Sequence, residues 1–271
     1  MNVGNEDHER VVIDQFTRQA DRFREFAEMP GQPRDMVLAV TEIDEGDTVL
    51  DVACGPGVTT CDLAEVAGYV TGIDVTPAMI EKARELQRAK GLTNVAWQVT
   101  AVPPLPFDDE AFSVVFTRYS IHHFPDPLAV LKEMARVCDA AGRVVVVDVF
   151  MTTPDQANAY NDMEKLRDPS HVRALLLDEL TELFAQTNLE LTKTVFYRQR
   201  MSLELLLKGS FPNPGDEDRV RQIILDDVGK DTLGLGAQRV DDDIRFDYPI
   251  AALVGKKRWS TVKRIPEGSN A

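Results

Sequence analysis

The 271-residue chain carries 45 acidic and 30 basic side chains, which gives a formal net charge of −15 at pH 7. A surface this acidic repels phosphate backbones and anionic lipids, so neither a nucleic-acid partner nor a membrane partner is expected. The hydrophobic content of 44% is enough for a sizeable core, no apolar run reaches membrane-spanning length and the first ten residues are polar, so we expect a cytoplasmic protein.

The N-terminal part of the chain is predicted to be helical. Over residues 6–28, apolar residues that include Phe16 and Phe23 recur at three- and four-residue spacing, which is typical of an amphipathic helix. A second, short helix is expected over residues 33–43. We interpret residues 1–45 as an N-terminal helical cap on the domain that follows.

The stretch from Val49 to Thr60, V-L-D-V-A-C-G-P-G-V-T-T, carries the strongest signal in the chain. An apolar run with one carboxylate, Asp51, breaks at Gly55-Pro56-Gly57, and a helical pattern follows. This order predicts a strand, a tight glycine turn and a helix, which together let a ligand approach the backbone near helix-terminal N–H groups. A second carboxylate, Asp74, ends the next apolar run, about 20 residues after the turn, where doubly wound folds hold a nucleotide ribose.

The two carboxylates favour S-adenosylmethionine over a dinucleotide as the ligand. Thr60 stands where the dinucleotide fingerprint G-x-G-x-x-G requires its third glycine. An anion at Asp51 would repel a pyrophosphate, but it would attract an ammonium or a sulfonium. S-adenosylmethionine has a cationic amino-acid end and a ribose but no phosphate, so a nicotinamide oxidoreductase is disfavoured.

Alternating helices and strands continue through the first half of the chain. Helices are expected over residues 76–90 and 126–138, and strands over residues 94–100, 112–118 and 143–150. This alternation predicts an α/β fold with a doubly wound parallel sheet. The three cysteines, Cys54, Cys61 and Cys138, lack the spacing of metal ligands, so no metal site is predicted.

The second half of the chain changes character. Helices are expected over residues 153–167 and 178–186, and strands over residues 189–201 and 246–255. We interpret residues 46–271 as one domain with helical insertions at 151–177 and 202–243, rather than as two domains.

The ordered set of strand, Asp51, Gly55-x-Gly57, helix and strand-ending Asp74 resembles the class I S-adenosylmethionine-dependent methyltransferases. Within them it is most similar to the ubiquinone/menaquinone-biosynthesis-like branch of small-molecule methyltransferases, and the resemblance covers residues 12–150 well. It implies a Rossmann-like, doubly wound, seven-stranded sheet with its last strand antiparallel. It also implies that the leading helix lies across the cofactor mouth.

The resemblance implies distinct partners for the two ends of the cofactor. Asp51 and the glycine backbone would face the methionine end, and Asp74 would accept hydrogen bonds from the ribose. Thr100 stands where many relatives carry an adenine-binding aspartate. The residues expected to bind the cofactor are Phe16, Phe23, Asp51, Ala53, Gly55, Gly57, Asp74, Val75, Met79, Thr100, Ala101, Val102, Arg118 and His123. For Phe16 and Phe23, simple core packing explains the pattern equally well.

Two adjacent histidines follow the fourth predicted strand, and Asp148 lies near the end of the fifth. The carboxyl ends of parallel strands border the ligand crevice, so His122, His123 and Asp148 are expected beside the methyl donor. Histidine is the natural base at neutral pH. This stretch also resembles sugar and small-molecule O-methyltransferases of the same branch, in which paired histidines and an aspartate of the fifth strand are implicated in catalysis. We therefore predict that one histidine, supported by Asp148, deprotonates an acceptor hydroxyl. In the alternative interpretation the histidines cap the next helix and pack against the cofactor.

Four residues are expected to bind the acceptor: Tyr119, Arg167, His171 and Arg173. The last three lie in the insertion at residues 151–177, where the resembled family places acceptor-binding elements. The two arginines with His171 are suited to an anionic or hydroxylated acceptor. A capped turn with solvated arginines is the competing interpretation.

The sequence thus predicts methyl transfer from S-adenosylmethionine to a small-molecule acceptor, with a hydroxyl as the first choice. Two alternatives stay open: C-methylation of an activated ring or quinone precursor, and a lyase or cyclase that binds the cofactor without methylating. The sequence does not identify the acceptor, and it allows a homodimer.

Overall fold

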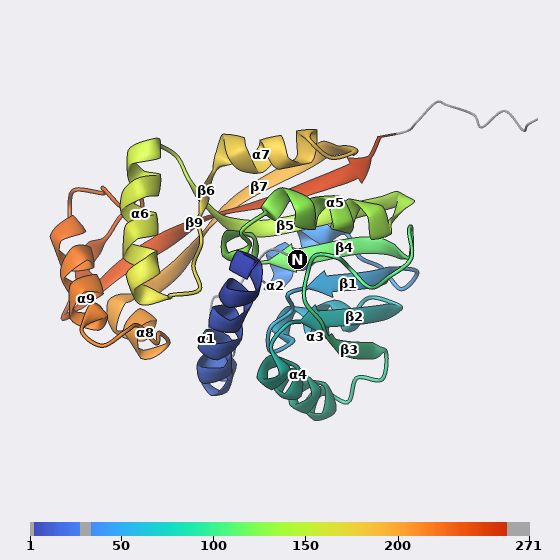
Figure 1. Ribbon diagram of the computed structural model, residues 1–271, viewed down its shortest axis with the longest axis horizontal. Coiled ribbons are helices and arrows are strands. Elements are labelled where there is room, and N and C mark those ends of the chain that lie inside the picture. Colours follow the sequence, from blue (N-terminus) through green and yellow to red (C-terminus); the bar gives the residue numbers. More distant parts are fainter. Residues whose placement is uncertain (1–2, 28–33, 259–271) are drawn as a thin grey trace, which may run out of the picture.

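A computed structural model describes residues 3–27 and 34–258 of the chain. Its main sheet has the strand order β3-β2-β1-β4-β5-β9-β7, with helices packed on both faces (Figure 1). The strands of this path are β1 (Thr48–Val52), β2 (Tyr69–Asp74), β3 (Val95–Val99), β4 (Phe112–Arg118), β5 (Cys138–Met151), β7 (Leu189–Ser202) and β9 (Asp243–Lys257).

The predicted seven-stranded, doubly wound arrangement is confirmed. Strands β1 to β5 pair in parallel, whereas β9 runs antiparallel to both β5 and β7. Two short strands were not predicted: β6 (Leu175–Leu176) pairs with β5, and β8 (Gln238–Val240) pairs with β9. Both lie within the segments that the sequence marked as insertions.

Helices separate β1 from β2, β2 from β3 and β4 from β5 as expected, whereas β3 leads to β4 without an α-helix. The α-helices of the described residues are α1 (Val3–Ala27), α2 (Arg34–Thr41), α3 (Val58–Ala64), α4 (Pro77–Lys90), α5 (Pro127–Val137), α6 (Pro154–Arg167), α7 (Leu177–Ala185), α8 (Leu203–Lys208) and α9 (Asp216–Asp227). Among the described residues, no helix is both long enough and apolar enough to span a membrane.

The central strands bury both of their faces. On β5, Val145 and Val147 join one hydrophobic cluster, whereas Val144 and Val146 join the cluster on the opposite face, and each is at most 2% exposed. Burial on both sides explains why this strand reads as a continuous apolar run in the sequence.

The fifth strand begins five residues before its expected start at residue 143. The expected strand over residues 143–150 leaves Gly142 just before it, but Gly142 lies within β5. A Cβ atom there would approach the Ser113 carbonyl oxygen to 2.5 Å, so glycine is required where β4 and β5 come close beside a register shift.

The two insertion segments gather at one end of the molecule. Helices α6, α8 and α9 lie over the long strands β7 and β9, at the left in Figure 1, whereas α3 and α4 accompany β1 to β3. Helix α1 lies between these two groups in the view and contacts α4, with an ion pair from Asp21 to Lys82. This placement brings α1, the glycine turn and the insertions around one cavity.

Candidate active site

A cavity of about 420 Å³ lies at the carboxyl ends of the parallel strands. Its lining includes Asp51 of β1, Asp74 of β2, Arg118 of β4 and Val149 of β5. The remaining lining comes from one face of α1, from the glycine turn and from the insertion segments. Its size falls within the range of small-molecule and cofactor sites.

Most residues predicted to bind the cofactor line this cavity. They are Phe16, Asp51, Ala53, Gly55, Asp74, Val75, Met79, Thr100, Ala101, Val102, Arg118 and His123. Gly57 is not among the lining residues. Phe23 lies on α1, but its side chain falls outside the described residues.

The two glycines of the turn have different roles. Both have positive φ, +54° at Gly55 and +76° at Gly57. A Cβ atom on Gly55 would meet nothing within 4 Å, so this backbone is open to the cavity. A Cβ atom on Gly57 would lie 2.5 Å from the Trp97 ring and 2.7 Å from the Ala83 Cβ atom. Gly57 therefore serves close packing beneath the turn, a role that needs Trp97 and could not be read from the turn alone.

We expect Gly57→Ala to destabilise the protein by about 1–3 kcal/mol, the usual cost of overpacking a core. Gly55→Ala is the matched control, because it carries a similar positive-φ cost without the clash. Urea unfolding of the two variants measures the difference. Equal free energies of unfolding would show that Trp97 moves aside.

Asp51 is a buried carboxylate with a raised pKa. It is 2% exposed and accepts a hydrogen bond of 2.6 Å from the Thr60 hydroxyl. Burial raises the pKa of Asp51 to about 7, although the Thr60 bond and the Arg118 charge lower it. Thr60, which breaks the dinucleotide fingerprint, thus holds the carboxylate at the end of β1. A buried anion of this kind suits a cationic ligand.

Asp74 is held by backbone groups on both of its oxygens. It accepts N–H bonds from Gly55 at 2.9 Å and from Thr76 at 2.8 Å. Burial raises the pKa of Asp74, and these two bonds partly offset the effect. Thr76 is the residue before α4; its side chain makes no capping hydrogen bond, and its backbone N–H is the group that binds Asp74.

His122 and Asp148 form a buried pair. The His122 Nδ1 atom lies 2.5 Å from Asp148 Oδ1, and Asp148 is 1% exposed. Asp148 also accepts the backbone N–H groups of Ile121 and Val149, each at 2.7 Å, so its carboxylate is fixed in place. Burial lowers the pKa of His122, but the charge and hydrogen bond of Asp148 outweigh it and leave the pKa above its ordinary value.

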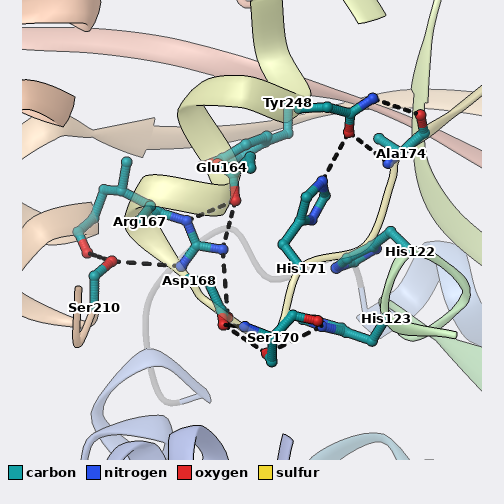
Figure 2. A network of polar contacts seen from close by, with 12 residues as sticks. His122, His123, Glu164, Arg167, Asp168, Ser170, His171, Ala174, Ser210 and Tyr248 are labelled. Atoms are coloured by element: carbon teal, nitrogen blue, oxygen red, sulfur yellow. Dashed lines mark hydrogen bonds and ion pairs between the residues drawn. The ribbon is translucent and has the colours of Figure 1, made fainter. Parts of the chain in front are cut away.

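His123 has a different environment from its neighbour. Its Nδ1–H donates to the Ser170 carbonyl at 3.0 Å, and its ring meets Phe16 edge-on at 5.1 Å (Figure 2 shows the Ser170 contact). Burial, with a contribution from His122, lowers the pKa of His123 to about 4. At neutral pH His123 is therefore uncharged and a weak base.

The comparison with known families agrees with this geometry. A profile described as "Methyltransferase domain" matches residues 43–201, more than half of the chain. The chain belongs to the methyltransferase domain family. It is therefore an S-adenosyl-L-methionine-dependent methyltransferase, as its sequence predicted.

Three relatives show how far the similarity extends. The methyltransferase is 29% identical to the uncharacterized methyltransferase YcgJ of Bacillus subtilis, over 90% of this chain and 98% of YcgJ. It is 29% identical to the 27-O-demethylrifamycin SV methyltransferase of Amycolatopsis mediterranei, over 58% of each chain. It is 32% identical to the demethylmenaquinone methyltransferase of B. subtilis, over 42% of this chain and 51% of that one. The crystal structure of YcgJ superposes with a TM-score of 0.77, over 84% of this chain and 98% of that chain, at 25% identity.

Two of the four predicted acceptor-binding residues of the methyltransferase line the cavity, and two do not. Tyr119 and Arg167 line the cavity. His171 lies behind the lining, 4% exposed, with its Nε2–H donated to Asn161 Oδ1 at 2.7 Å. Arg173 is exposed, forms an ion pair with Glu179 and is not among the lining residues, so its acceptor-binding role stays a prediction. The sequence placed both in the insertion but could not show which way their side chains point.

Sequence reasoning missed several residues that line the cavity. From α1, His8 donates a hydrogen bond of 2.8 Å to the His123 carbonyl oxygen. From α6 and β9 come Tyr160, Glu164 and Tyr248. No local motif marks these positions. Tyr160 and Glu164 meet Tyr248 only because α6 folds over the extended end of β9.

Proposed function

We propose that this methyltransferase transfers the methyl group to a hydroxyl of a small molecule, with His122 and Asp148 as its base. The observation that carries the proposal is the 2.5 Å hydrogen bond from His122 Nδ1 to the buried Asp148. Because Nδ1–H is donated to the carboxylate, the lone pair lies on Nε2. No other hydrogen bond to this ring is formed by the described residues, and the ring borders the cavity.

The cavity residues fit S-adenosyl-L-methionine. Asp51 offers a buried negative charge for the cationic methionine end, and the open backbone at Gly55 admits a close approach. Asp74 offers a fixed carboxylate for the ribose hydroxyls. We assign Val75, Met79 and residues 100–102 to the adenine. When bound, the cofactor supplies an electrophilic methyl carbon, whose bond to sulfur breaks with the electron pair left on sulfur.

The proposed step uses His122 as a proton acceptor. The acceptor O–H proton passes to Nε2 while the acceptor oxygen bonds to the methyl carbon, and Asp148 stabilises the imidazolium that forms. The products are a methyl ether and S-adenosylhomocysteine, and the proton then leaves His122 for solvent. His123, with its low pKa and its packing against Phe16, is assigned a positioning role.

Acceptor turnover tests the proposal. Release of S-adenosylhomocysteine should depend on a hydroxylated acceptor, and mass spectrometry should locate the new methyl group on oxygen. The similarity to demethylmenaquinone methyltransferase supports C-methylation as the second candidate. A product with its new methyl group on carbon would support that candidate instead.

Asp74→Ala should weaken S-adenosylmethionine binding by about 1.5–3 kcal/mol, the cost of losing a hydrogen bond to a charged group. Isothermal titration calorimetry measures this loss. Asp218→Ala, an exposed position on α9, is the matched control and should bind like the wild type. Unchanged affinity in Asp74→Ala would remove this carboxylate from the cofactor site.

A further inference from the structure

Arg167 is one of three guanidinium groups among the described lining residues, and neighbouring carboxylates neutralise its charge. Its Nε and Nη2 atoms each lie 2.6 Å from Glu164 Oε2, and Nη2 lies 3.8 Å from Asp168 Oδ2 (Figure 2). Its Nη1 donates to the Ser210 hydroxyl at 3.4 Å. Arg167 is therefore committed to protein groups, and it is poorly placed to bind a substrate anion.

The two carboxylates are engaged as well. Glu164 Oε1 accepts from the Tyr248 hydroxyl at 3.4 Å, and Asp168 Oδ1 accepts from the Ser170 N–H at 2.9 Å and from its hydroxyl at 2.5 Å. Glu164 and Asp168 are each 2% exposed. A substrate ammonium would have to displace these internal partners to pair with either carboxylate.

The charge of the whole cavity also disfavours an anionic acceptor. The described lining residues include five carboxylates and three guanidinium groups, a formal surplus of two negative charges that partial protonation of Asp51, with its pKa of about 7, reduces near neutral pH: Glu9, Asp51, Asp74, Glu164 and Asp168 against Arg22, Arg118 and Arg167. Arg22 lies over the Phe211 ring, 4.9 Å from its centroid. A bound sulfonium cofactor offsets only part of this surplus.

Apolar and aromatic side chains make up much of the lining beside Arg167, together with the amide of Gln199. The apolar ones include Val149, Met201, Leu206 and Ile250. The rings of Tyr160 and Tyr248 face one another edge-on, with centroids 6.3 Å apart. Such walls favour a flat aromatic body, which pairs well with aromatic side chains.

We propose that the acceptor is an uncharged phenol, with its ring among these apolar side chains and its hydroxyl directed to His122. The proposal rests on the hydroxyl-directed methyl transfer proposed above. A phenol suits this base better than an alkanol does. The pKa of a phenol is about 10, whereas that of water is about 15.7, so an imidazole deprotonates a phenol at far lower cost.

The test uses matched pairs of phenols. One member of each pair carries a carboxylic acid on its ring, and the other carries the methyl ester of that acid. Calorimetry on protein saturated with S-adenosylhomocysteine should show the ester binding about 100-fold more tightly than the acid, because the acid must bury an unpaired charge. In turnover assays, kcat/KM should show the same preference.

One substitution should weaken the discrimination. Glu164→Gln removes the main partner of Arg167, so the guanidinium becomes able to pair with a substrate carboxylate, and the preference for the ester should fall by at least about tenfold. Asp168→Asn is a second route to the same result if Glu164→Gln does not fold. Glu204→Gln is the matched control: it breaks an exposed ion pair with Arg221 in the other insertion, residues 202–243, and should leave the preference unchanged.

The outcomes separate the two proposals. Equal binding of acid and ester, tighter binding of the acid, or no binding of either across the panel would overturn the uncharged phenol. If the esters bind selectively but are never methylated on oxygen, the acceptor class stands and the hydroxyl-directed transfer fails.

Discussion

His122→Ala should lower kcat for methyl transfer by about 10²- to 10⁴-fold, the range that general-base catalysis contributes. S-adenosylmethionine affinity should stay within a few-fold, because the ring is hydrogen-bonded to Asp148 and not to Asp51 or Asp74, the carboxylates assigned to the cofactor. Single-turnover rates and calorimetry on the same preparation measure the two effects separately.

His123→Ala is the matched control for this experiment. Its ring packs against Phe16 and bonds to Ser170, and its pKa of about 4 makes it a poor proton acceptor. Its loss should lower the melting temperature, whereas kcat should fall by less than about tenfold. If both alanine variants cost less than about tenfold in kcat, the acceptor does not need a base, as expected for an activated carbon nucleophile.

The pH profile adds an independent readout on the same pair. Because the pKa of His122 lies above its ordinary value, kcat should fall as the pH drops through that pKa and protonation removes the Nε2 lone pair. Asp148→Asn removes the charge that raises it, so the midpoint should move to lower pH and kcat should fall. A profile that is identical in wild type and Asp148→Asn would contradict the His122–Asp148 base.

Asp51 should make cofactor binding depend on pH. The pKa of Asp51 is raised to about 7 by burial, and a cationic ligand favours the ionised carboxylate. Affinity for S-adenosylmethionine should therefore rise about tenfold per pH unit below pH 7 and level off above it. Binding below pH 7 should release a proton, which calorimetry in buffers of different ionisation enthalpy detects. Measurements between about pH 5.5 and 7.5 avoid titration of an α-amino group near pH 8.

Two variants test this assignment. Asp51→Asn should remove the pH dependence and weaken binding by about 1.5–3 kcal/mol, since it leaves the cationic end without its charged partner. Thr60→Val removes the hydrogen bond that lowers the pKa of Asp51, so the midpoint should move to higher pH. A flat profile in the wild type would show that Asp51 is ionised throughout, or that it does not contact the cofactor.

Local sequence patterns predicted the sheet and the cofactor side of the cavity. The strand carrying Asp51, the turn at Gly55 and the strand ending in Asp74 depend on residues close together in the chain, and the parallel topology then brings their ends to one edge. These local elements can be predicted without knowing which distant residues pack against them. The same locality made Gly142 misleading, because its role depends on the approach of a neighbouring strand.

The proposed base and the proposed acceptor side depend on tertiary structure. His122 and His123 are adjacent, and their difference arises because a 3-10 turn directs one toward Asp148 and the other toward Ser170. Arg167 looked like an anion-binding residue in the sequence, but Glu164 and Asp168 neutralise it. These pairings depend on which way each side chain points once β5, α6 and the following loop have packed. The direction of a polar side chain cannot be read from the sequence, because it is fixed by a partner that only the tertiary structure brings close.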